Sequence, residues 1–164
     1  MIHQLVNSPE WAKTDTSSVE ATASGAAFLP PELRVKFQSK LEAGFAHGYG
    51  LSESVRVSPP LTVLEKFTYL MQTFGVIGSM RENVIPGYKP IDKSLGLLLP
   101  SLQARIVRED GTDCGIGEPG EFWVKGGSIS QGYLDDERAT AETFTQDGWL
   151  KTGDIFTVDE KGNY

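Results

Sequence analysis

The sequence predicts an α+β fold, in which a strand–helix–strand (βαβ) portion is followed by a small antiparallel, β-barrel-like portion. Two patterns support this prediction. In the first third of the chain, a run of apolar residues at helical spacing lies between two short strand-like runs. After residue 94, apolar and polar residues alternate in short runs separated by turn residues, which is typical of antiparallel strands.

The first portion carries one helix between two strands. A loosely helical segment at 2–12 precedes a strand expected at 19–24. Pro30, Pro31 and Glu32 open the next helix, because proline lacks the N–H that has no partner in a first turn, and we expect Gly44 to end it. Its apolar face repeats every four residues and consists of Leu33, Phe37 and Leu41. This order indicates a βαβ unit.

The second portion carries several short strands. They are expected at 102–107, 122–125 and 149–158. A short helix ends at Phe144, and either Asp135 or Asp136 can cap its start. Strands at this spacing indicate a small barrel or sandwich. Between the two portions, residues 61–80 have the apolar spacing of a helix, which we expect Gly75 and Gly78 to end.

Composition excludes two classes of protein. The 164 residues carry a formal net charge of −7, whereas nucleic-acid binding needs clustered positive charge, so we expect no nucleic-acid partner. No apolar run approaches the ~18 residues needed to cross a bilayer, so we expect no membrane span. The single cysteine, Cys114, fits a reducing compartment. The two histidines, His3 and His47, fit structural positions better than catalytic ones.

One short segment places several ligand-binding groups together. Gly48 and Gly50 flank Tyr49, so the backbone can approach a ligand closely while the ring offers a flat face to a base. Ser52 adds a hydroxyl, and Glu53 adds a carboxylate of the kind that Mg²⁺ prefers. Taken alone, the segment also fits a strand end with one exposed acid.

Two further segments carry candidate binding residues. Asp154 follows a Thr-Gly pair, where its carboxylate can present both oxygens to a vicinal diol such as that of ribose. Gly25, Ala26 and Ala27 form a loop of small residues that can lie flat against a planar ligand. The structural alternatives are a turn aspartate in a hairpin and a tight strand–helix connection.

Together these segments resemble the adenylate-forming (AMP-binding) superfamily of acyl-CoA synthetases, and within it the 4-coumarate-CoA ligase-like branch. Seven segments match the family in order, at 24–27, 48–53, 98–100, 117–126, 132–134, 139–144 and 148–154. The resemblance covers residues 1–54 and 94–164. It implies that the chain is an incomplete piece of the large N-terminal domain of such an enzyme.

The resemblance also implies a division into three parts. Residues 1–60 would be part of the α/β nucleotide-binding subdomain, and 94–164 a β-barrel-like subdomain that ends before the family's hinge. Residues 61–93 are an unmatched insertion or linker. Two alternatives stay open for their apolar stretch: a genuine helical insertion, or a segment introduced by an imperfect gene model.

Roles for individual residues follow from the same resemblance. The implied nucleotide-binding positions are Gly25, Ala26, Ala27, Tyr49, Gly50 and Asp154. Tyr49 would stack near adenine, and Asp154 would hold the ribose hydroxyls. Ser52, which stands where the family usually has threonine, would hydrogen-bond a phosphate oxygen. Glu53 would bind Mg²⁺ and would form the catalytic pair with Ser52.

The implied reaction has two steps. A small carboxylic acid attacks the α-phosphate of ATP to give an acyl-adenylate, and the thiol of coenzyme A then displaces AMP to form a thioester. The family's phosphate loop and its mobile C-terminal domain have no match here, so we expect this chain alone to be inactive without those N- and C-terminal parts of the same enzyme. The alternative is a non-catalytic nucleotide-binding remnant or interaction module. A cytoplasmic or peroxisomal location is expected.

Overall fold

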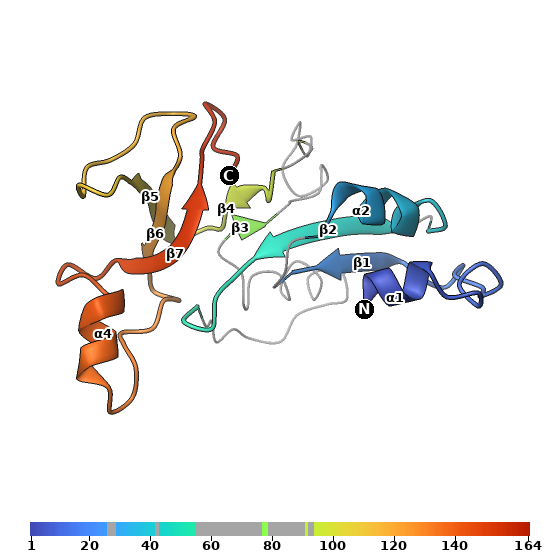
Figure 1. Cartoon of the computed structure of the whole chain (residues 1–164), viewed down its shortest axis with the longest axis horizontal. Helices are drawn as coiled ribbons and strands as arrows, with labels where there is room; N and C mark the ends of the chain where they lie inside the picture. Colours follow the sequence, from blue (N-terminus) through green and yellow to red (C-terminus); the bar gives the residue numbers. More distant parts are fainter. Residues whose placement is uncertain (26–28, 42, 55–76, 79–90, 92–93) are drawn as a thin grey trace.

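The computed structural model describes residues 1–25, 29–41, 43–54, 77–78, 91 and 94–164, arranged around two sheets (Figure 1). Most of the helix expected at 61–80 lies outside these residues. Its described part, β3 (Ile77–Gly78), is a strand, so the prediction that the helix reaches Gly78 is wrong. Within the described ranges, no helix is long and apolar enough to cross a membrane.

The βαβ unit is confirmed. It consists of β1 (Ala21–Ser24), α2 (Pro31–Gln38) and β2 (Gly44–Tyr49). β1 and β2 run parallel, with Ala21 opposite Gly44 and Ser24 opposite His47. β3 and β4 (Leu97–Leu98) add two antiparallel pairings and complete a sheet of order β1-β2-β3-β4.

The helix α2 begins where the sequence predicts and ends earlier. Pro31 occupies its first turn. The last turn closes when the N–H of Ser39 donates to the carbonyl of Val35 at 2.9 Å, so the helix ends at Gln38. The prediction that Gly44 ends the helix is therefore wrong. The chain needs the residues after Ser39 to reverse direction, and Gly44 is the first residue of β2.

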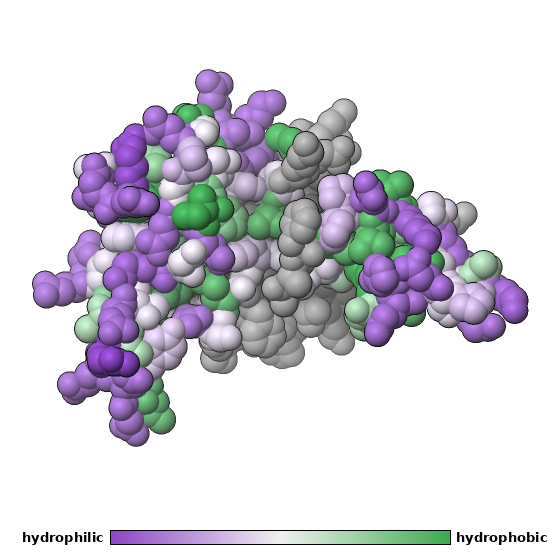
Figure 2. All heavy atoms as spheres, viewed as in Figure 1, coloured by the Kyte–Doolittle hydropathy of each residue, from purple (hydrophilic) through white to green (hydrophobic). Residues whose placement is uncertain are grey.

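A small core joins α2 to α1 (Ile2–Val6), which is shorter than the helical segment expected at 2–12. Its buried members are Val6, Phe37 and Leu41. Phe37 stacks on Trp11 with ring centroids 5.3 Å apart. The ring of Phe45 in β2 meets the Phe37 ring edge-on, with centroids 6.2 Å apart. Figure 2 shows hydrophobic side chains gathered at this α1–α2 end, with hydrophilic ones around them.

The second sheet is antiparallel and open. It consists of β5 (Leu102–Val107), β6 (Gly120–Gly126) and β7 (Leu150–Phe156), in the order β5-β6-β7. The antiparallel arrangement is confirmed, and the sheet is not closed into a barrel, because β5 and β7 are both edges among the described strands. Three strands are too few to close on themselves. Residues outside this sheet cover its apolar face instead, including Tyr49, Leu51 and Leu98.

The main core lies on that covered face. Its buried members are Ile106, Phe122, Val124 and Leu150. Phe122 and Val124 are separated by one residue on β6, so the alternation in the sequence correctly predicts which face of this strand is buried. The helix α4 (Glu137–Thr143) precedes β7. Asp136, rather than Asp135, caps it by accepting a hydrogen bond from the N–H of Ala139 at 2.8 Å.

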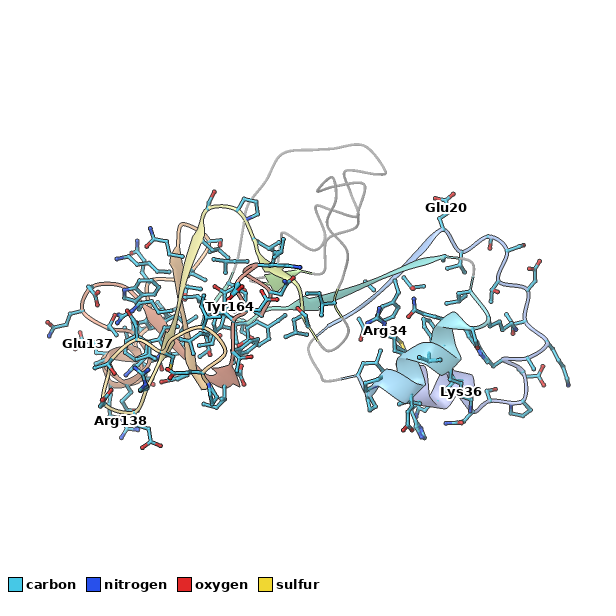
Figure 3. The ribbon with its side chains drawn as sticks, turned by 90° about the horizontal axis from the view of Figure 1, so that it is seen from above. Glu20, Arg34, Lys36, Glu137, Arg138 and Tyr164 are labelled. Carbon is cyan, nitrogen blue, oxygen red and sulfur yellow. The ribbon has the colours of Figure 1, made fainter. Side chains whose placement is uncertain are left out.

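The strand β2 connects the two ends of the molecule. Figures 1 and 3 show α1 and α2 at one end, the three-stranded sheet with α4 at the other, and β2 between them. Glu137 and Arg138 lie at the outer edge of the second end, whereas Tyr164 lies inside it (Figure 3). The carboxyl end of β2 therefore reaches the second sheet, and the segment that follows β2 lies beside that sheet.

The main core makes a testable prediction at its largest fully buried side chain. Replacing Phe122, which is 0% exposed, by alanine should lower the free energy of unfolding of the protein that carries this sequence by about 3–5 kcal/mol. Urea denaturation followed by fluorescence measures the change. Leu134→Ala is the control, because Leu134 is 92% exposed and its loss should change stability by less than about 0.5 kcal/mol. Equal effects of the two substitutions would contradict this assignment of the core.

Candidate functional site

Two of the predicted site residues meet directly. The hydroxyl of Tyr49, the last residue of β2, donates a hydrogen bond to the carboxylate of Asp154 in β7, 105 residues further along the chain. The Tyr49 ring is fixed edge-on against Phe156 at 5.0 Å and Phe122 at 6.0 Å between centroids. The structure therefore brings the two sequence segments to one place.

The environment of Tyr49 keeps its hydroxyl protonated. Burial raises the pKa of Tyr49 well above its ordinary value, and the hydrogen bond to the Asp154 carboxylate raises it further. Ionising the phenol would place a second negative charge beside Asp154. Tyr49 is therefore a hydrogen-bond donor across the physiological pH range, and its acceptor, Asp154, is exposed on the surface.

A local irregularity of the sheet presents Asp154. Glu121 of β6 pairs with Ile155 and Trp123 pairs with Lys151, so three residues of β7 lie opposite one residue of β6. Gly153, in the middle of the three, has φ +75°, a value that glycine adopts without strain. Such a bulge interrupts the alternation of side chains along a strand and re-aims the residue beside it.

Side-chain hydrogen bonds hold this bulge. The hydroxyl of Thr152 donates to the carbonyl of Phe122 at 2.7 Å and accepts from the N–H of Asp154 at 3.2 Å. The carboxylate of Glu121 accepts from the N–H of Gly153 at 3.0 Å and from the indole N–H of Trp123 at 2.8 Å. These bonds satisfy backbone groups that the interrupted ladder leaves unpaired.

Glu53 reaches the same region from the turn after β2. The buried hydroxyl of Ser54 donates to the carbonyl of Leu51 at 2.8 Å and so closes that turn. The carbonyl of Glu53 accepts from the N–H of Ser130 at 2.8 Å, and its carboxylate accepts from the hydroxyl of Tyr133. The turn is thereby fixed to the segment that leads into α4.

A cleft of about 450 Å³ lies between these elements. Its lining residues are Leu51, Glu53, Glu121, Tyr133, Glu142, Thr143, Leu150, Lys151, Thr152 and Gly153. They come from the turn after β2, from β6, from α4 with its preceding loop, and from β7. The cleft is thus bordered by the Glu53 turn on one side and by the bulge that carries Asp154 on the other.

The remaining predicted site residues lie around this region or outside the described residues. Gly25 lies beside the β2 segment, because a Cβ added to it would be 3.2 Å from the carbonyl oxygen of Gly48. Ser52 is exposed in the turn that precedes Glu53. Gly50 is half-buried just after β2. Ala26 and Ala27 lie outside the described residues, so their predicted role stays a prediction.

The described residues contain no group of three or more His, Cys, Asp or Glu side chains that could hold a metal ion. A single carboxylate such as Glu53 fits Mg²⁺ only when the ion takes its other ligands from water and from phosphate oxygens, which is how Mg²⁺ commonly binds beside nucleotides. The residues present therefore fit a metal that arrives with its nucleotide.

Comparison with known proteins identifies the family. The model of the family described as AMP-binding enzyme matches residues 1–134. The chain belongs to this family. The resemblance inferred from the sequence is therefore confirmed, and it extends to named acid–CoA ligases.

Relatives of this AMP-binding chain match it over almost its whole length. A probable 4-coumarate–CoA ligase 1 from Dictyostelium discoideum is 36% identical over 163 residues, which is 98% of this chain and 25% of that protein. The long-chain-fatty-acid–CoA ligase of Haemophilus influenzae is 27% identical over 160 residues, which is 98% of this chain and 24% of that protein. The chain thus spans about a quarter of the length of these relatives.

Solved structures share its fold. The anthranilate CoA ligase AuaEII in complex with anthranoyl-AMP matches with a TM-score of 0.75 and 21% identity, over 99% of this chain and 27% of that one. ATP-bound MatB from Rhodopseudomonas palustris matches with a TM-score of 0.73 and 21% identity, over 99% of this chain and 28% of that one. The α+β arrangement is therefore that of adenylate-forming enzymes.

Tyr133 and Glu121 line the cleft of this AMP-binding chain, but the sequence alone predicted no role for either of them. Tyr133 belongs to the matched segment 132–134, and Glu121 to the matched segment 117–126. Their membership in matched segments was an available signal. Their partners, Glu53 and Gly153, lie far away in the sequence, so local spacing could not reveal them.

The bulge makes a testable prediction. Gly153→Ala should lower the free energy of unfolding by about 1–2 kcal/mol, because a side chain is strained at positive φ, although no neighbouring atom lies within 4 Å of the added Cβ. Thermal denaturation measures the change. Gly127→Ala is the matched control, since Gly127 also has no neighbour within 4 Å but has no positive φ. A loss as large at Gly127 would contradict the argument from backbone conformation.

Proposed function

We propose that this chain forms part of the ATP site of an acid–CoA ligase. The observation that carries the proposal is the hydrogen bond from Tyr49 to Asp154, with Glu53 on the neighbouring turn. Tyr49 and Glu53 lie within residues 1–134, which match the AMP-binding family, and Asp154 belongs to the segment 148–154, which resembles that family. Side chains with these chemistries, gathered beside one cleft, suit the three parts of a nucleotide: base, ribose and phosphate.

Asp154 and Tyr49 are the proposed contacts to the nucleoside. An aspartate carboxylate has two oxygens that accept hydrogen bonds, and the Tyr49 hydroxyl donates to one of them. The second oxygen is then oriented toward the hydroxyls of ribose. The half-buried Tyr49 ring offers part of an aromatic surface to adenine, and Gly25 lies beside the adjacent β2 backbone without a side chain to block approach.

Glu53 and Ser52 are the proposed contacts to the phosphate end. The exposed Ser52 hydroxyl can donate to a phosphate oxygen. The carboxylate of Glu53 suits a Mg²⁺ ion that is shared with the phosphates. When bound, such an ion neutralises charge on the phosphates.

The proposed reaction uses these contacts for positioning. A carboxylate attacks the α-phosphate of ATP, the bond to pyrophosphate breaks, and an acyl-adenylate forms; the thiol of coenzyme A then attacks the acyl carbon and AMP leaves. Holding ribose and phosphate in one orientation lowers the entropic part of the barrier. The named relatives act on acids as different as 4-coumarate and long-chain fatty acids, which supports a carboxylic acid as the substrate class.

The ribose contact can be tested in the protein at its native length. Asp154→Ala should weaken binding of ATP roughly 10- to 150-fold, because a lost charge-assisted hydrogen bond costs about 1.5–3 kcal/mol. ATP–pyrophosphate exchange, measured against ATP concentration with several carboxylic acids, gives the change in KM. Glu109→Ala is the control, because it removes the same charge from an exposed turn outside the cleft. An unchanged KM for ATP in the Asp154 variant would contradict the proposal.

A second prediction concerns the 164 residues alone. They correspond to about a quarter of the ligases that they match, so we expect this polypeptide to form no acyl-adenylate above background in a hydroxamate-trapping assay. Calorimetry with AMP on the same polypeptide separates the alternatives. Weak or undetectable binding fits a piece of a larger ligase, whereas tight binding favours a nucleotide-binding module without catalysis.

A further inference from the structure

We propose that Tyr133 is a positioning residue, whose hydroxyl orients the Glu53 carboxylate toward the Mg²⁺ of a bound Mg²⁺–ATP complex. This inference rests on the function proposed for Glu53. Its basis is the hydrogen bond that the Tyr133 hydroxyl donates to that carboxylate. The two residues are 80 positions apart, so the fold, rather than local sequence, creates the contact.

Several interactions fix the backbone on both sides of this contact. The N–H of Ser130 donates to the carbonyl of Glu53 at 2.8 Å, and Ser54 forms an isolated antiparallel bridge with Ile129. The segment that carries Tyr133 is therefore paired with the turn that carries Glu53. The hydroxyl and the carboxylate meet because their backbones are already held together.

The side of Tyr133 that faces α4 is fixed as well. Its N–H donates to the hydroxyl of Thr140 at 2.9 Å, and its ring meets Phe144 edge-on with centroids 6.1 Å apart. Gly132 permits this close packing, because a Cβ there would lie 2.6 Å from the γ-methyl of Thr140. Tyr133 therefore has a defined direction although 39% of it is exposed.

A carboxylate held by a tyrosine is better suited to binding a cation than a carboxylate in an ion pair, whose charge is already compensated by a basic side chain. A tyrosine donates one hydrogen bond but carries no charge, so it orients the Glu53 carboxylate without pairing it with a basic side chain. A phenol that holds one carboxylate oxygen leaves the other oxygen for a metal, which is the usual arrangement of an outer partner to a ligand.

The neighbouring carboxylates of the cleft have other partners. Glu121 accepts from Gly153 and Trp123, as described above. Glu142 lies 3.8 Å from the guanidinium of Arg138, one turn away on α4. Glu53 differs from both, because its carboxylate accepts from a phenol on a segment 80 residues away, whereas Glu121 holds the bulge and Glu142 lies beside a guanidinium.

The experiment measures nucleotide binding instead of turnover. In the protein at its native length, calorimetry with a non-hydrolysable ATP analogue gives the Mg²⁺ concentration for half-maximal binding. Tyr133→Phe keeps the ring against Phe144 and removes only the hydroxyl. We expect it to raise that concentration about tenfold, while binding of AMP in EDTA stays unchanged.

Tyr164→Phe is the matched control. It also removes one phenolic hydroxyl, and its ring packs in the core against Phe122 at 5.4 Å without lining the cleft. We expect it to leave the Mg²⁺ dependence unchanged. A general loss of packing would instead shift both variants, and would also weaken AMP binding.

Glu53→Gln separates failure of this inference from failure of the proposed function. If Glu53→Gln leaves the Mg²⁺ dependence unchanged, Glu53 does not act on the metal and the role proposed for it fails. Suppose that Glu53→Gln raises the Mg²⁺ concentration for half-maximal binding, whereas Tyr133→Phe leaves that concentration unchanged or lowers it. Then only the inference about Tyr133 is overturned. The inference is supported if each single variant raises this Mg²⁺ concentration and if adding Tyr133→Phe to the Glu53→Gln variant causes no further increase.

Discussion

The position of Tyr49 is the constraint on which the rest of the structure depends. Its ring packs against Phe122 and Phe156 of the second sheet although its backbone ends a strand of the first. Aromatic packing of this kind fixes both distance and angle. The packing of the ring thereby sets the direction of the hydroxyl, which donates its hydrogen bond to the carboxylate of Asp154. One side chain thus joins the two sheets and also forms the first contact of the candidate site.

The site lies where regular structure is interrupted. A regular strand sends successive side chains to opposite faces, so it cannot gather neighbouring residues on one side. Here a turn follows β2 and delivers Glu53, while a bulge in β7 re-aims Asp154. Both irregularities are held by hydrogen bonds from side chains, those of Ser54 and of Thr152 with Glu121. The regular strands of the two sheets therefore determine where Glu53 and Asp154 lie, and the turn and the bulge determine the direction of their side chains.

The sequence predicted features that depend on local pattern. The four-residue repeat through Phe37 and the alternation of Phe122 with Val124 correctly identified a helix face and a strand face. The sequence left open whether the second sheet forms a barrel or a sandwich, because closure depends on which strands meet and not on the pattern within one strand. The Tyr133–Glu53 contact was missed for the same reason: it joins segments 80 residues apart. The proximity of Tyr49 and Asp154 was expected only through a family resemblance, since no spacing rule relates them.

The proposed binding of an anionic nucleotide has to be consistent with the acidity of the chain. The residues that line the cleft include three glutamates and one lysine, so a bare polyphosphate would be repelled by the cleft as a whole. The guanidinium of Arg138 lies 3.8 Å from Glu142 and partly compensates one of those charges. Glu53 is oriented by an uncharged phenol. The cleft is therefore suited to a phosphate that brings a divalent cation with it, because the cation is attracted by the same carboxylate that would repel the phosphate alone.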